Sequence, residues 1–151
     1  MAEHLLSERL AIVEVIDPDA LTAGTTAGDA IDMSVHDKVM FILMVGDIIS
    51  TGKVDLQIKE SDASSGTYHK ISGKSIVQFT EATSTRNDCQ AIINVSASEL
   101  TAGHRYIKGY LAVTTAAADV AVLALANKTR FSDAVTSTSY GDLASVVEIV
   151  A

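Results

Sequence analysis

Lys53-Val54-Asp55-Leu56-Gln57-Ile58-Lys59 alternates polar and apolar residues at every step. Successive side chains on a β-strand point to opposite faces, so this stretch predicts a strand with one dry face and one wet face. Similar runs recur at 38–46, 88–95, 104–114 and 118–127, separated by clusters of Gly, Ser, Thr and Asp. Strands spaced by such turn residues are typical of an all-β domain.

The length of 151 residues fits one domain. We predict a mainly β fold, an antiparallel β-sandwich or a jelly-roll-like barrel, with a short N-terminal helix or arm and an extended C-terminal tail. Residues 1–16 would hold a helix over 3–10 and a strand over 11–16. Residues 17–130 would form the sandwich core, and residues 131–151 the C-terminal arm.

Several local signals predict where the strands end. Asp17-Pro18-Asp19 predicts the end of the first strand, because proline cannot donate to a strand ladder. Residues 20–28 predict a loop. Ser72-Gly73 predicts a turn between two short strands. The stretch from Lys38 to Val45 is apolar enough to predict a central strand that is covered on both faces.

The composition predicts a core of aliphatic side chains and a surface with net negative charge. Hydrophobic residues make up 48% of the chain, aromatic residues only 5%, and Trp is absent. The net charge is −8 and no basic cluster occurs, which disfavours binding to nucleic acid and to an anionic membrane surface. The single cysteine, Cys89, excludes an intrachain disulfide, and we expect it to be a small buried hydrophobe.

The sequence carries no recognisable catalytic or metal-binding motif. Gly73-Lys74-Ser75 resembles the end of a phosphate-binding loop, but Tyr68 stands where that loop needs a glycine. The histidines lie in separate elements without metal-ligand spacing, and we expect them to face solvent: His4, His36, His69 and His104. We therefore expect no enzyme activity, no bound metal and no cofactor.

Apolar side chains gather at both termini, where they form a candidate subunit or partner interface. The candidate interface residues are Leu5, Leu6, Leu10, Val13, Val146, Val147 and Ile149. The first four share one side if the N-terminal segment is helical. The sequence allows two interpretations: these side chains pack on the chain's own sheet, or they bind a neighbouring subunit.

Several segments together resemble a family of small head structural proteins of tailed bacteriophages, which are capsid decoration or cement-like proteins. The segments that carry the resemblance are Ala30-Ile31-Asp32-Met33-Ser34, Val39-Met40-Phe41-Ile42-Leu43 with Gly46, Asp55-Leu56-Gln57-Ile58-Lys59-Glu60-Ser61, Ile71-Ser72-Gly73-Lys74-Ser75-Ile76-Val77-Gln78-Phe79-Thr80, Glu99-Leu100-Thr101-Ala102-Gly103-His104-Arg105-Tyr106-Ile107 and Asp142-Leu143-Ala144-Ser145-Val146-Val147-Glu148-Ile149-Val150. Val35-His36 departs from the family pattern, which has a glycine after the first segment.

The resemblance implies a virion structural protein that binds the outside of a phage head and stabilises the shell. Its implied partners are the major capsid protein and further copies of itself, with a homotrimer expected because it would match a threefold capsid position. Neither nucleic acid nor membrane is an expected partner. We expect synthesis in the host cytoplasm and a final place in the virion. A head–tail connector, another minor virion protein or a virion-displayed ligand-binding module is the alternative.

Overall fold

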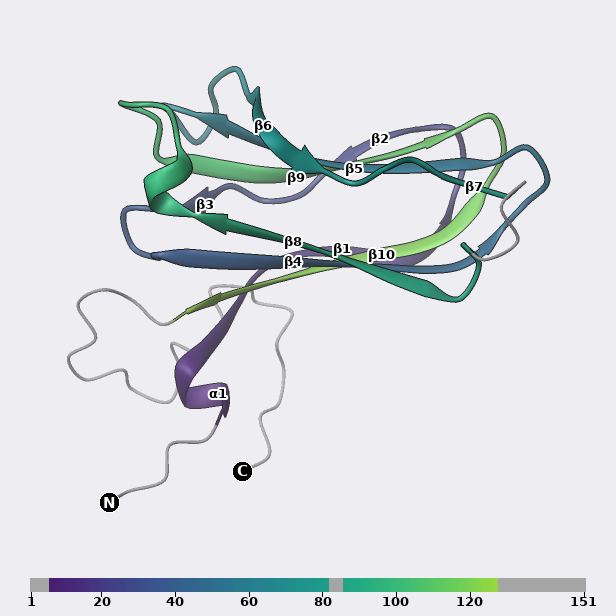
Figure 1. The fold of residues 1–151 in the computed structure, drawn as a ribbon, viewed down its shortest axis with the longest axis horizontal. Coiled ribbons are helices and arrows are strands. Elements are labelled where there is room, and N and C mark those ends of the chain that lie inside the picture. The colour runs from purple at the N-terminus through teal and green to yellow at the C-terminus, as the bar shows by residue number, and fades with distance from the viewer. Residues whose placement is uncertain (1–5, 82–85, 128–151) are drawn as a thin grey trace.

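The computed structural model describes residues 6–81 and 86–127, which form two antiparallel β-sheets packed face to face as a β-sandwich (Figure 1). This confirms the predicted sandwich. The elements are α1 (Leu6–Arg9), β1 (Leu10–Leu21), β2 (Gly24–Ala27), β3 (Ile31–Asp32), β4 (Lys38–Ile48), β5 (Lys53–Ser61), β6 (His69–Ser75), β7 (Phe79–Thr80), β8 (Cys89–Ser96), a 3₁₀ turn (Ala97–Glu99), β9 (Tyr106–Thr114) and β10 (Ala118–Asn127). The expected C-terminal arm, 131–151, lies outside the described residues.

The strands divide into a four-stranded and a six-stranded sheet. The four-stranded sheet has the order β1-β10-β4-β8. The six-stranded sheet has the order β2-β9-β5-β6, with β3 pairing to β9 and β7 pairing to β5. The chain therefore passes repeatedly from one sheet to the other, for example between β4 and β5 and again between β9 and β10. Within the described part of the chain, no helix is long and apolar enough to cross a membrane.

The core lies between the sheets and is built from aliphatic side chains. On β5, Val54, Leu56 and Ile58 are fully buried while Asp55 and Gln57 are half-buried, which confirms the predicted alternation. The other strands contribute Val39, Phe41, Leu43 and Val45 from β4, Ile107, Leu111 and Val113 from β9, and Val120, Val122 and Ala124 from β10. Burying one Val, Leu or Ile stabilises the fold by roughly 1.5–3 kcal/mol.

The turn between β4 and β5 shows how local sequence directs the crossing between sheets. Thr51 adopts a φ of 71°. Gly52 then donates its N–H to the Ile49 carbonyl at 2.7 Å. A Cβ at position 52 would lie 2.7 Å from that same oxygen, so this tight turn requires glycine.

The first strand is longer than the sequence predicted, and the prediction of its end at Asp17-Pro18-Asp19 is wrong. β1 continues to Leu21, and its pairing with β10 skips between Ile16 and Asp19. Pro18 therefore sits at an irregularity in an edge strand, where no ladder hydrogen bond is required of it. The predicted helix over 3–10 is shorter within the described residues, and residues 10–16 belong to the four-stranded sheet rather than to an arm.

Two further turn predictions are also wrong. Part of the predicted loop at 20–28 is strand β2, which pairs with β9. The predicted turn at Ser72-Gly73 lies inside β6 instead. Gly73 has a φ of 75°, and the β5–β6 register shifts close to it, so this glycine bends a strand without ending it.

Candidate interaction surface

The outer face of the six-stranded sheet is polar and is covered by its own side chains. The ammonium group of Lys59 lies 4.1 Å from the ring centre of Tyr110, and that of Lys108 lies 5.0 Å from the ring centre of Tyr68. The two tyrosine rings are 6.1 Å apart. Long cationic side chains laid over aromatic rings cover apolar surface while their charges stay in water. This face has the polar coat that a solvated sheet normally carries.

The outer face of the four-stranded sheet is apolar instead. The side chains that point away from the core and form this outer apolar face are Ile12 and Val15 of β1, Leu123 and Leu125 of β10, Met40, Ile42 and Met44 of β4, and Ile92 of β8. Ile92 is 58% exposed and Met44 is 39% exposed. The remaining six are half-buried.

The strand register joins these side chains into one continuous band. Ile42 on β4 lies opposite Leu123 on one side and Ile92 on the other. Leu123 in turn lies opposite Val15 on β1. Directly opposed residues have Cβ atoms about 5 Å apart and therefore touch. The band crosses all four strands, so these apolar side chains form one continuous patch.

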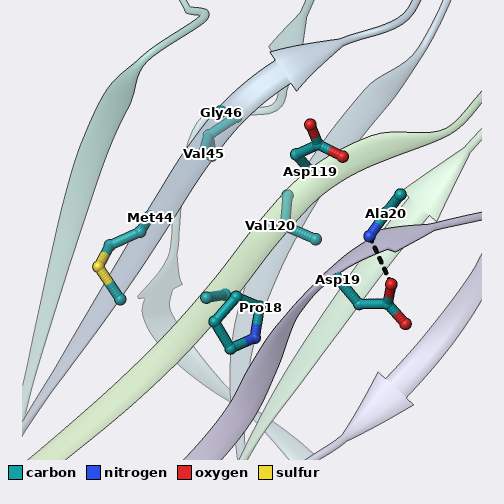
Figure 2. Close-up of a pocket in the computed structure, with 9 residues that line it drawn as sticks. Pro18, Asp19, Ala20, Met44, Val45, Gly46, Asp119 and Val120 are labelled. Atoms are coloured by element: carbon teal, nitrogen blue, oxygen red, sulfur yellow. Dashed lines mark hydrogen bonds between the residues drawn. The ribbon is translucent and has the colours of Figure 1, made fainter.

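A shallow hollow lies at one end of the outer apolar face, and its rim is acidic (Figure 2). Met44 and Asp119 rise from the neighbouring strands β4 and β10, and Pro18 comes from β1. A Cβ at Gly46 would approach the Cβ of Asp119 to 3.2 Å, so the missing side chain at position 46 helps to keep this hollow open. The Asp19 carboxylate accepts a hydrogen bond from the N–H of Ala20 at 2.8 Å.

A second groove lies at the opposite end of the same face. It is lined by Leu10, Lys38, Met40, Asn94, Leu125 and Asn127, among others. The N–H of Lys38 donates to the side-chain oxygen of Asn127 at 3.0 Å, which fixes the start of β4 against the end of β10. Lys74 is neutralised by Glu99 at 2.8 Å, whereas Lys38 is exposed. This end of the face therefore exposes the Lys38 ammonium group, next to the half-buried Asp37, whereas the first end exposes carboxylates.

A buried carboxyl group, Glu14, joins the two sheets. Val13 is an extra residue in the β1–β10 pairing, so both Val13 and Glu14 turn inward. The Glu14 carboxyl oxygens lie 3.2 and 3.1 Å from the Gly109 nitrogen, whose N–H they accept. Burial raises the pKa of Glu14 from 4.5 to about 8, against the lowering effect of the Gly109 hydrogen bond. Glu14 is fully enclosed, so it contacts no solute and acts on stability alone.

Gly28 provides space for the Glu14 carboxyl group. A Cβ at position 28 would overlap the Cδ and Oε1 atoms of Glu14. We therefore expect Gly28→Ala to destabilise the protein by about 1–3 kcal/mol through overpacking. In a Glu14→Ala background the same substitution should cost much less, because the obstructing atoms are gone. Chemical denaturation of both single variants and the double variant measures this coupling, and strict additivity would contradict the contact.

A second buried carboxylate, Glu60, fixes the loop before β9. The Thr101 N–H donates to it at 2.9 Å, and the Thr101 hydroxyl donates to its other oxygen. The Nδ1 atom of His104 lies 3.4 Å from Glu60 Oε1, and the rings of His104 and His69 stack at 6.2 Å. The fold thus brings together two histidines that the sequence separates. Across residues 6–81 and 86–127, no three His, Cys, Asp or Glu side chains gather as a metal site.

The candidate interface residues fall into three groups. Leu6 in α1 is 72% exposed and Leu10 at the start of β1 is 37% exposed, so both are available to a partner. Val13 is only 7% exposed and belongs to the core, so for this residue the structure agrees with the first alternative, packing on the chain's own sheet. Leu5, Val146, Val147 and Ile149 lie outside the described residues.

Two other expectations also need correction. His36 is buried rather than solvent-facing, and its Nδ1 lies 2.9 Å from the Asn127 carbonyl oxygen. Cys89 is half-buried and packs against the core from β8. The outer apolar face was not identified from the sequence, although the run from Lys38 to Val45 carried its signal. A strand that is apolar on both faces is expected to be covered by other elements on both faces. Among the described residues, only the inner face of β4 is covered.

No protein-family model matches the chain, and no curated protein matches it.

Proposed function

We propose that this protein is a structural component of a phage virion: a decoration or cement protein that binds the outside of the head and stabilises the shell. It acts through contacts with the major capsid protein and with copies of itself. The observation that carries the proposal is the gathering of exposed apolar side chains on one side of the sandwich. On that side, Leu6 and Leu10 of the N-terminal arm are available to the shell, and the outer apolar face is available to a neighbouring copy.

The shape of the N-terminal region supports attachment by an arm. α1 lies outside the sandwich, beyond the four-stranded sheet (Figure 1), and its Leu6 is 72% exposed. The net charge of −8 favours contact with protein over contact with packaged DNA. Contacts that exist only on the expanded shell stabilise that state by mass action. The resemblance to small phage head proteins is the basis for naming the shell as the partner.

Co-sedimentation with expanded, DNA-free heads of the phage that carries this gene tests the proposal. We expect saturable binding at many sites per head, and heads that resist heat better once coated. A well-folded protein that stays in the supernatant at every concentration would contradict the proposal. Binding of only one oligomer per head would favour the connector alternative instead.

A truncation separates the arm from the sandwich. Removing residues 1–9 deletes α1 but keeps β1 complete, including the core residues Val13 and Glu14. We expect occupancy of the heads to fall at least tenfold, while the melting temperature changes little. The substitution Val77→Ala, at an 81% exposed position between β6 and β7, serves as the control and should leave occupancy unchanged. Full occupancy by the truncated protein would remove the arm from the attachment surface.

A further inference from the structure

The two ends of the outer apolar face carry different charged side chains. Lys38 at the start of β4 and Arg9 just before β1 lie at one end, and both are exposed. Asp119 at the start of β10 lies at the other end with Asp17 and Asp19, and all three are exposed. β10 and β4 are antiparallel, so the start of one lies beside the end of the other. The Lys38 end and the Asp119 end are roughly 27 Å apart along the strands.

We infer that the outer apolar face pairs with the same face of a second copy of this chain. The two-fold axis lies between the facing sheets and runs perpendicular to the strands. This rotation reverses the strand direction, so Lys38 of each copy lies over the Asp119 end of the other. A two-fold axis parallel to the strands would set like charges together, which is unfavourable. The charges thus select one of the two possible pairings.

The size of the face suits a modest but specific dimer. Four strands spaced about 4.8 Å apart and about 27 Å long present roughly 500 Å² in each copy. Pairing two copies would bury about 1,000 Å² in total, which reaches the lower bound of specific interfaces. The centre would be Ile42 and Leu123 on the inner strands β4 and β10, with Ile92 beside Ile42 on the edge strand β8, and the charged ends would form a polar rim. This is the usual anatomy of a protein interface.

The pairing deepens the proposed function, since it rests on the view that the protein works by adhesion and names the occupant of one surface. It is tested without any phage head. A dimer that fails to bind heads contradicts only the proposed function. A protein that binds heads as a monomer contradicts only the pairing.

Sedimentation velocity and native mass spectrometry of the full chain, from about 1 to 100 µM, test the inference. We expect a concentration-dependent dimer. Ile92→Asp places a charge next to Ile42 within the paired faces, midway along the edge strand β8, and should weaken the dimer at least a hundredfold. Val77→Asp is the matched control, because it adds the same charge at an exposed apolar position outside the face, and it should leave the dimer intact.

Charge reversal tests the direction of the pairing. Lys38→Asp and Asp119→Lys should each weaken the homodimer about tenfold, because each puts like charges together at two symmetric places. An equimolar mixture of the two variants should form a heterodimer of nearly wild-type strength, since every facing pair is then of opposite sign. Failure of the mixture to associate, when each variant is folded, would overturn the two-fold arrangement.

Three results would overturn the pairing as a whole. One is a wild-type protein that stays monomeric at 100 µM. Another is a trimer that Ile92→Asp does not affect, because it would be built from a different surface. The third is a monomer that dimerises only after residues 128–151 are removed, because the chain's own C-terminal segment would then be the occupant.

Discussion

Replacing Glu14 by Gln is expected to leave stability little changed at pH 4 and to raise it by several kcal/mol at pH 8 and above. Burial raises the pKa of Glu14 to about 8, whereas the unfolded chain keeps a value near 4.5. Below the lower value the carboxyl group is protonated in both states, so the two proteins behave alike. Between the two values the unfolded state loses its proton first, so the wild-type protein loses stability as the pH rises.

The size of the effect follows from the two pKa values. Each pKa unit corresponds to 1.36 kcal/mol, so the full loss is of the order of 5 kcal/mol and is complete just above pH 8. Glutamine has nearly the same shape and no charge to bury, so the variant avoids this loss. Its carboxamide oxygen still accepts the Gly109 N–H.

Urea denaturation of both proteins between pH 4 and pH 9, at one protein concentration, measures the difference directly. The control is Val77→Ala, which changes an exposed position without changing any charge and should give a profile parallel to the wild type. Parallel profiles for Glu14→Gln and the wild type would show that the carboxyl group ionises freely, and would contradict its enclosure between the sheets.

Replacing Phe41 by Ala is expected to lower the free energy of unfolding by about 3–5 kcal/mol. Phe41 is fully buried in β4, and its Cε1 atom would lie 3.5 Å from a Cβ at Gly109 in the opposite sheet. The ring therefore fills the space between the layers, and its loss leaves a cavity that flanking β-strands cannot close. Thermal and urea denaturation measure this loss.

An exposed position near the end of the same strand provides the control for Phe41. Ile49 directly follows β4 and is 55% exposed, so Ile49→Ala should change stability by less than about 0.5 kcal/mol. A loss below 1 kcal/mol for Phe41→Ala would mean that the two sheets do not pack around this side chain.

The strands were the part of the structure that the sequence predicted best, because alternation is a local signal. The run from Lys53 to Lys59 is one strand of the sandwich with its apolar side inward, as predicted. The errors lie where tertiary position overrides local preference. Pro18 fails to end β1 because an edge strand with an irregular register tolerates it. Gly73 fails to end β6 because a positive φ bends a strand as readily as it turns one.

The buried carboxyl group shows why the candidate site was harder to predict. Plain alternation over residues 11–16 places Glu14 on the same side as Ile12 and Ile16. The extra residue at Val13 breaks that pattern, so Glu14 and Ile16 face the core while Ile12 faces outward. The space that receives the carboxyl group comes from glycines far away in the sequence. No local pattern carries that information.

The outer apolar face could be predicted less well than the strands but better than the burial of Glu14. Its apolar residues were visible in the sequence as a run without alternation, and the predicted central position of β4 is confirmed. Which face of β4 is left uncovered depends on the order of the strands in the sheet and on how the two sheets pack. That information is non-local, so the asymmetry between the polar and the apolar outer sides appears only in the folded protein.

The proposal that this protein coats a phage head can be examined directly in a cryo-electron microscopy map of the virion that it is proposed to coat. We expect density for a two-layered β-sandwich repeated at many equivalent positions over the outside of the head, with α1 toward the shell. Density for the sandwich at a single vertex, in the tail, or nowhere on the particle would contradict it.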